Sequence, residues 1–464
     1  MPRTVEPDTR IPRMRRSSLL GGDGGRGAGS PATRPTIIAG VVGKLVELPP
    51  LALMFTLVPR VLGPARFGEF ALGFFTVTLG SACVALSGAA LMSRFIATAP
   101  PERRIHIAYS LAMDVGRRRL VQIAAVGVCG LLLSLTLPGR FPPAFVAIVI
   151  LALAVDLLAT LCFQIALGLG RTTLWSFRYA IQNSTILVST LLLTAVFGAK
   201  AAIGGLLIGS ITALAIGAAA VFAPLTAARA DGKKEQHGGL SADMSRFRTL
   251  KGLSNLLTQL AHRSGVILVA IVTGSRVQTG YAGLAIGASL TATYAIWQVF
   301  TVQLPAQSRE TTRDHQGVEE ALKRFARRAE FVSVSLALLA AAILSPVFSL
   351  LLGDRFLGAR PALALGIAVI PLAPLTALGS QIATLRLRPD VEVRATALGA
   401  AVFFAVALAA IPFWGATGAT AALLVSALAT VALLIVGLRG AISLGTTAVA
   451  LAAVAGVLAI RILA

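Results

Sequence analysis

The sequence predicts an all-α membrane protein with two pseudo-symmetric six-helix bundles around a central cavity, followed by one extra hydrophobic helix. Its 464 residues are 56% hydrophobic and 13% charged, and their mean hydropathy is +0.83. A water-soluble domain carries about 25% charged residues, so a chain this apolar must be in contact with lipid. Its apolar stretches are long enough for helices with a rise of ~1.5 Å per residue to cross a ~30 Å hydrocarbon layer.

The apolar spans divide the chain into five parts. Residues 1–35 are rich in Arg, Pro and Gly, and predict a disordered basic tail without the apolar core of a signal peptide. Residues 36–224 hold an N-terminal bundle, 225–249 a hydrophilic cytoplasmic linker, 250–439 a C-terminal bundle and 440–464 the extra helix. The predicted spans are 36–58, 68–92, 120–138, 144–168, 179–198, 201–223, 250–273, 279–304, 329–352, 361–385, 394–412, 417–437 and 443–461, and the last either crosses the membrane or lies flat on it.

The two predicted bundles begin with a similar turn. Arg60-Val61, before the second span, recurs as Arg276-Val277 before the eighth, and Gly68 recurs as Gly280. The loop at Arg60–Gly68 is rich in Gly and Pro and is expected to be a tight connection between two membrane helices. Two halves of similar layout are typical of transporters.

The basic residues predict the orientation. The segments on the side of the N-terminal tail hold 31 of the 41 Lys and Arg residues, and the opposite segments hold 8. Cytoplasmic loops carry the excess of Lys and Arg, so the N-terminus is expected in the cytoplasm. Two of these basic segments, 100–119 and 317–330, are expected to lie on the inner leaflet as amphipathic helices, the second with Leu322, Phe325 and Ala329 on its apolar face.

Charge and cysteine usage exclude other classes. The net charge of +22 is compatible with nucleic-acid binding, but the cations are grouped in loops between apolar spans, so no nucleic-acid partner is expected. Cys83, Cys129 and Cys162 lie within spans and are interpreted as small buried hydrophobes. The four histidines have no metal-ligand spacing, so no metal site is predicted.

Four motifs together resemble those of a known family. The segment Arg60–Ala97 reads R-x-L-G-P-x-x-F-G-x-[FY]-x-L, followed by a span of small residues that ends at Ser93-Arg94. LSNLLTQLAHR at 253–263, LLLGDRFLGARP at 350–361 and WGATGATA at 414–421 follow in order. This pattern, over roughly residues 36–437, resembles polysaccharide flippases of the multidrug/oligosaccharidyl-lipid/polysaccharide exporter superfamily. The family often has an acidic residue before the seventh-span arginine, where this chain has His262.

The resemblance implies two six-helix bundles that move undecaprenyl-pyrophosphate-linked oligosaccharide outward by alternating access. It also implies a bacterial inner membrane, with membrane lipids, a lipid-linked oligosaccharide, a glycan polymerase and glycosyltransferases as partners. No catalytic residue is expected. No cofactor is expected either, although Na⁺ or H⁺ could serve as the coupling ion.

Charged residues near the centre of the spans are the first site candidates. A charge at mid-membrane costs at least ~2.5–3.5 kcal/mol, so it usually faces a cavity or a partner. Lys44 and Glu47 lie near the centre of the first span, just before Pro49-Pro50, and prolines leave helix carbonyls unpaired. Broken helices at mid-depth mark binding sites in transporters. We therefore expect both residues in the cavity, the alternative being a self-neutralising pair at a kink.

The seventh span supplies a second group of candidates. The repeat offset makes Arg263 the equivalent of Glu47, so equivalent helices carry opposite charges at equal depth. Asn255, Gln259 and Arg263 recur every fourth residue with His262 beside them. Such a polar face is expected to meet water or sugar, although interhelical hydrogen bonding is the alternative. A guanidinium suits bidentate contact with phosphate, so Arg263 is expected to bind the pyrophosphate.

Other spans add to the expected cavity. Asp156, Thr160 and Gln164 form a similar stripe in the fourth span, where Asp156 is expected to hold a proton or Na⁺ or to balance a cation. Arg94 is expected to meet the pyrophosphate at the cytoplasmic mouth, its alternative role being a topology anchor. Side chains that could stack on or bond to sugar, or simply pack, are Tyr294, Trp297 and Gln381.

Two other interpretations stay open from the sequence. The first is a cation-coupled multidrug or lipid II exporter of the same superfamily, for which Glu47 and Asp156 would bind the cation. The second is a membrane glycan polymerase or ligase. Such an enzyme usually presents acid and base groups in a large extramembrane loop, whereas the outside loops here are short and hold no paired carboxylates.

Overall fold

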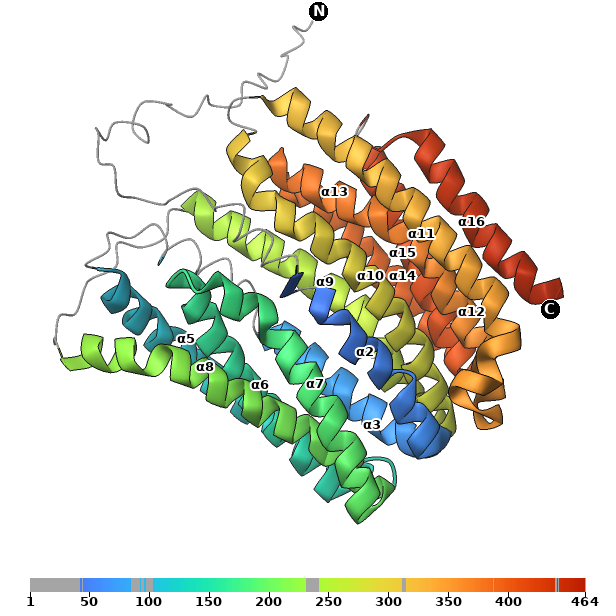
Figure 1. Cartoon of the computed structure of the whole chain (residues 1–464), viewed down its shortest axis with the longest axis horizontal. Helices are drawn as coiled ribbons and strands as arrows, with labels where there is room; N and C mark the ends of the chain where they lie inside the picture. Colours follow the sequence, from blue (N-terminus) through green and yellow to red (C-terminus); the bar gives the residue numbers. More distant parts are fainter. Residues whose placement is uncertain are drawn as a thin grey trace, which may run out of the picture.

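The computed structural model describes residues 42–84 except Lys44, then Met92, Ile96, 103–230, 242–310, 314–386 and 388–463 except 439 and 441. Every regular element in these ranges is a helix, which confirms the all-α prediction (Figure 1). Nine of the described helices are long and apolar enough to cross a membrane. The chain is therefore a multi-pass helical membrane protein.

The N-terminal helices are α2 to α8. The elements are α2 (Leu48–Met54), α3 (Leu57–Val84), α5 (Arg104–Thr136), α6 (Pro143–Gly168), α7 (Thr172–Phe197), the short 3-10 helix η1 (Ala199–Ile203) and α8 (Gly204–Ala230). α6 and α8 pack together, and α5 and α7 cover them from either side. Figure 1 shows this blue-to-green group on one side of the molecule.

The C-terminal helices are α9 to α16. The elements are α9 (Ala242–Thr273), α10 (Arg276–Glu310), α11 (His315–Leu352), η2 (Asp354–Ala359), α12 (Arg360–Val369), η3 (Ile370–Leu372), α13 (Ala373–Leu385), α14 (Pro389–Trp414), α15 (Ala416–Gly437) and α16 (Leu444–Leu463). The tenth predicted span is α12–η3–α13, which bends into a 3-10 turn at Pro371 and is the most buried of the spans. α16 packs along α11 and α12 and runs beside α11 in Figure 1 rather than across the end of the helices.

The turn between the first two spans is much shorter than predicted. The expected loop Arg60–Gly68 is helical on both sides of one residue, Gly63, whose φ of 71° and ψ of 169° break α3. Glycine has no Cβ to oppose a positive φ, and Pro64 then starts the next helical segment with its fixed φ. One Gly-Pro pair therefore makes the chain reversal for which a loop of nine residues was expected.

The two segments expected on the inner leaflet are parts of long helices. Residues 104–119 continue without a break into the third span as α5, and residues 317–330 continue into the ninth span as α11. Leu322 is 1% exposed, and Phe325 packs edge-on against Phe300 of α10 at 4.9 Å between ring centroids. The apolar face was predicted correctly, but it packs against protein. The predicted linker 225–249 is likewise helical at both described ends, up to Ala230 and from Ala242.

α3 joins the two groups of helices, because it packs against both α9 and α10. At the end of this seam where α10 begins, the repeat-related Gly68 and Gly280 face each other. A Cβ added at Gly68 would lie 2.9 Å from the Gly280 nitrogen, and one added at Gly280 would meet the Pro64 carbonyl. The absence of side chains thus lets the two backbones touch. We call the surrounding end, with the turns at 137–142 and 274–275, the short-loop end.

Candidate functional site

The polar stripe of α6 lies inside the N-terminal helices. Asp156, Thr160 and Gln164 are spaced every fourth residue, share one helix face and are each less than 5% exposed. α6 is otherwise strongly apolar, so the helix buries this face only because neighbouring helices supply polar partners.

Asp156 is the centre of this network. From α7, Arg178 Nη2 donates to Asp156 Oδ1 at 3.1 Å and to Thr160 Oγ1 at 2.6 Å, and Gln182 Nε2 donates to Asp156 Oδ1 at 2.8 Å. The Ser81 hydroxyl of α3 donates to the second carboxylate oxygen. The Arg178 side chain is 1% exposed and that of Asp156 is 6% exposed. A buried ion pair needs this many hydrogen bonds to offset its desolvation.

A second buried guanidinium extends the network. Arg119 of α5 is 2% exposed, and it donates to the Leu157 carbonyl at 2.7 Å and to Gln164 Oε1 at 2.6 Å. The charges of Arg119, Arg178 and Asp156 act on one another. Nε of Arg119 and both Nε and Nη1 of Arg178 have no hydrogen-bond partner among the described residues. The network therefore holds two cations for one carboxylate, with N–H donors to spare, which suits an anion.

Arg263 places a third cation where the two groups of helices meet. On α9 it donates from Nε to Gln259 Oε1 at 2.5 Å. The negative charges of Glu47, at the start of α2, and of Asp156 act on it. Glu47 is only 3% exposed. The opposite charges that the internal repeat placed at equal depth are thus close enough to attract each other.

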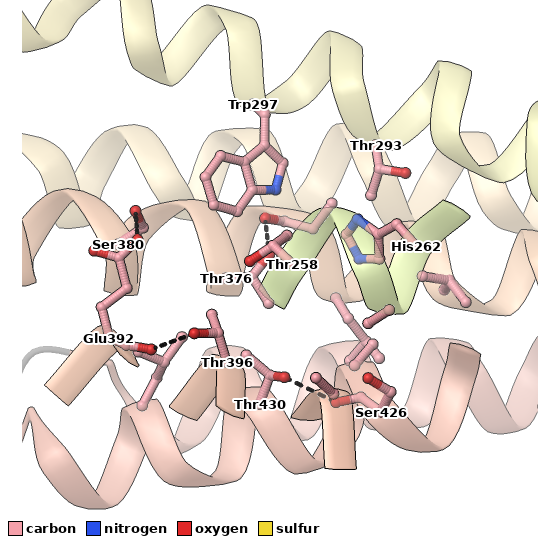
Figure 2. A pocket seen from close by; sticks show the side chains of 17 residues that line it. Thr258, His262, Thr293, Trp297, Thr376, Ser380, Glu392, Thr396, Ser426 and Thr430 are labelled. Carbon is pink, nitrogen blue, oxygen red and sulfur yellow. Dashed lines mark hydrogen bonds between the residues drawn. The ribbon is translucent and has the colours of Figure 1, made fainter. Parts of the chain in front are cut away.

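A separate small cavity of about 50 Å³ lies within the C-terminal helices, between α9, α10, α13, α14 and α15. Figure 2 shows Trp297 and His262 beside it, with threonine and serine side chains from the facing helices. Most of these hydroxyls donate to their own helix, as Thr258 does to the Ser254 carbonyl at 2.9 Å and Thr430 to the Ser426 carbonyl at 2.9 Å. A cavity needs about 10–15 Å³ of such volume to hold one water, so this one has room for a few waters or a small ion.

An ammonium group binds two of the residues that line this cavity, Ser380 and Glu392. Lys251 Nζ lies 2.6 Å and 2.8 Å from the two carboxylate oxygens of Glu392, and 3.1 Å from the hydroxyls of both Ser380 and Thr384. Glu392 is 7% exposed and Lys251 33%. The lysine thus ties the start of the seventh span to α13 and α14 and neutralises the one carboxylate that lines the cavity.

The structure divides the predicted site residues among three places rather than one cavity. Glu47, Gln259, Arg263 and Tyr294 lie at the seam, Asp156 and Gln164 in the network of the N-terminal helices, and His262 and Trp297 at the small cavity. Asn255 is exposed and lines neither the network nor that cavity, and Gln381 is buried without lining it. Lys44 and Arg94 lie outside the described residues.

Three cations were not predicted as site residues, because their positions in the sequence lie in segments expected to be cytoplasmic. Arg119 and Lys251 stand at the edges of apolar spans, where a cation usually marks the membrane surface. Arg178 had a usable signal: Gln182 follows it by four residues in the fifth span, so the two share one polar face. Within the described part of the chain, no three His, Cys, Asp or Glu residues form a metal-binding group.

The chain is similar to known transporters in structure but not detectably in sequence. No protein-family model matches it, and no curated protein matches it either. The structure of the lipid II flippase MurJ in an inward closed conformation has a TM-score of 0.63 at 12% identity, over 92% of this chain and 92% of that chain. An inward-facing multidrug resistance MATE family transporter of the MOP superfamily has a TM-score of 0.57 at 14% identity, over 87% and 98%.

An outward-facing MATE family transporter of the MOP superfamily matches with a TM-score of 0.53 at 14% identity, over 89% of this chain and 96% of that chain. Identities this low show a shared fold and leave the substrate to be argued from the site. The protein is a multi-pass membrane protein with the fold of the MOP-superfamily transporters.

Proposed function

We propose that the protein is a transporter that flips lipid-linked oligosaccharide, carried on a diphosphate such as undecaprenyl pyrophosphate, from the cytoplasmic to the outer leaflet of a bacterial inner membrane for surface polysaccharide synthesis. The observation that supports this most is the buried pair of guanidinium groups, Arg119 and Arg178, around the single carboxylate of Asp156. A diphosphate offers the negative charge and the acceptor oxygens that this network lacks.

The mechanism follows from where the cations lie. Arg263 at the seam and the Arg178 network beside it would attract the diphosphate between the two groups of helices, while the lipid tail stays in the bilayer. Rocking of the groups about the α3–α9–α10 seam would then expose the head group to the other side. Glycan polymerase and glycosyltransferases are the partners expected to consume and supply such a substrate.

We further propose Na⁺ or H⁺ as the coupling ion. Glu47 and Asp156 are the carboxylates whose charges act on Arg263. Loss of either charge by protonation, or its screening by Na⁺, would strengthen the pull of Arg263 on an anion, which links ion binding to substrate binding.

The test uses purified protein in liposomes and a fluorescent diphosphate-linked oligosaccharide. Arg119→Gln should slow its translocation at least about tenfold, because a hydrogen bond to a charged group is worth about 1.5–3 kcal/mol. Arg117→Gln is the matched control, since Arg117 is exposed two residues away on the same helix. Undiminished transport in both Arg119→Gln and Arg263→Gln would refute the diphosphate role.

A cation-coupled multidrug or lipid II exporter is the second candidate, favoured by the buried carboxylates of Glu47 and Asp156. We expect expression of the protein to restore surface polysaccharide in a flippase-deficient strain, and to restore neither drug tolerance nor lipid II export. We also expect incubation with lipid-linked sugar to leave the sugar covalently unchanged. A new covalent product would instead favour a polymerase or ligase.

A further inference from the structure

A second and larger cavity, of about 450 Å³, lies at the short-loop end between the N-terminal and C-terminal helices. Its walls come from the part of α3 that follows Gly63, the turn between α5 and α6 with the first turns of α6, η1, the end of α9 and the start of α10. It is separate from the small cavity of Figure 2, with which it shares no lining residue.

Four cations line this cavity: Arg66, Arg140, Lys200 and Arg276. The carboxylate of Glu69 is the single acidic side chain among its lining residues. The membrane face at this end has only 8 of the 41 Lys and Arg residues of the chain, and half of those eight line one cavity. Chance scattering does not account for this concentration where cations are otherwise rare.

The cations are unevenly neutralised. Glu69 binds Arg66 at 2.9 Å and, across the seam, Arg276 at 2.5 Å, so one carboxylate serves two guanidinium groups. Arg140 donates to the backbone carbonyl of Ile271. Neither Arg140 nor Lys200 makes an ion pair with any residue that the structure describes. Cations that line the same cavity repel one another, and an anion bound between them would offset this repulsion.

Two long helices begin at the same cavity and add to its positive potential. α6 starts at Pro143 and α10 at Arg276, and residues of both first turns line the wall. Backbone N–H groups at a helix N-terminus carry a partial positive charge that favours phosphate.

The rest of the wall is apolar. Phe70, Leu72, Phe145 and Ile148 line the cavity beside the cations. A cavity with fixed positive charge on one side and aromatic and aliphatic side chains on the other matches an amphiphile with a phosphate head more closely than a free sugar.

We propose that this cavity binds a phosphate-bearing group and, resting on the proposed function, that it receives the diphosphate of the transported lipid at the short-loop end before release. The same chemistry could come from inorganic pyrophosphate, from a lipid diphosphate or from an anionic phospholipid head group. The experiment therefore needs a readout that reports on this cavity alone and does not depend on transport.

Acetylation of Lys200 is such a readout, because its amine is exposed in the cavity wall. Full-length protein in phosphatidylcholine nanodiscs is treated with acetic anhydride and its lysines are quantified by mass spectrometry. Pyrophosphate at up to about 10 mM should slow acetylation of Lys200 and leave Lys323, on α11 outside the cavity, unaffected, while chloride at matched ionic strength should protect neither. Parallel runs use farnesyl diphosphate, and nanodiscs with added phosphatidylglycerol, to separate the three sources.

Arg140→Gln should raise the pyrophosphate concentration for half-maximal protection about tenfold, since it removes one charge-assisted contact. Arg355→Gln is the matched control, because Arg355 is exposed at the same end and does not line the cavity. Absent protection, equal protection by chloride, or an Arg140→Gln variant that behaves like wild type would each overturn the proposal. Protection without oligosaccharide transport would keep this site and refute the proposed function instead.

Discussion

Gly68→Ala tests whether the backbone contact between α3 and α10 closes the short-loop end. The added methyl would lie 2.9 Å from the Gly280 nitrogen and closer still to the Arg276 carbonyl oxygen, where ordinary contacts begin at 3.4 Å. The Gly280 contact alone would require the helices to separate by about 0.5 Å (3.4 − 2.9 Å), and the tighter Arg276 contact requires more. Overpacking of this kind costs about 1–3 kcal/mol. If the cost falls on the closed state alone, the ratio of open to closed protein rises about 5- to 150-fold.

The assay is double electron–electron resonance between spin labels at Thr136 and Asp354, exposed residues on opposite sides of the seam, in a background without the native cysteines. We expect Gly68→Ala to shift the distribution toward longer distances and to slow transport. Gly116→Ala is the control, because its added methyl would meet Leu161 at an ordinary 3.6 Å. An unchanged distance distribution and wild-type transport in Gly68→Ala would refute the closing role of this contact.

Three further predictions concern the ion pairs. Asp156→Ala should lower the free energy of unfolding in detergent by about 3–5 kcal/mol, because it leaves the Arg178 guanidinium buried without its counter-charge. The double variant Asp156→Ala/Arg178→Met should recover most of this loss. Lys251→Met should lower the free energy of unfolding by about 2 kcal/mol, because the buried Glu392 carboxylate loses its ammonium partner. An unchanged melting temperature would contradict this. Burial raises the pKa of Glu319, but hydrogen bonds from Arg386 and Lys323 outweigh it and lower the pKa below its usual 4.5. This stabilisation is present above pH 4.5 and lost as pH falls through the folded pKa, so the melting-temperature gap between wild type and Glu319→Gln should close in acid.

The internal repeat in the sequence predicted some of the residues that lie at the seam between the two groups of helices. The sequence pairs Gly68 with Gly280 and Glu47 with Arg263 as equivalent positions. In the structure the two glycines touch, and the charge of Glu47 acts on Arg263. What the repeat could not specify is the tightness of that approach. It depends on the backbones of two helices, α3 and α10, coming into contact, and a sequence records only that the side chains there are small.

Other parts of the site could not be predicted for a different reason. A cation next to an apolar span has the same local sequence whether it faces lipid head groups, as expected for Arg119 and Lys251, or folds back into the helices. The choice depends on an acceptor more than 40 residues away in the first case, Gln164, and 141 residues away in the second, Glu392. The same holds for the apolar face of residues 317–330, which packs on Phe300 and not on lipid.

Composition and span length by themselves determined that this is an all-α membrane protein, because backbone groups in hydrocarbon must bond within helices whatever the partners are. The positions of charges within the spans also identified Asp156 and Arg263 as residues that need a polar surrounding. Only the tertiary structure decided which cations surround them and which line the cavity at the short-loop end. Those groupings are made by residues from different helices, and electrostatic attraction and hydrogen bonding act over a few ångströms of space, not along the chain.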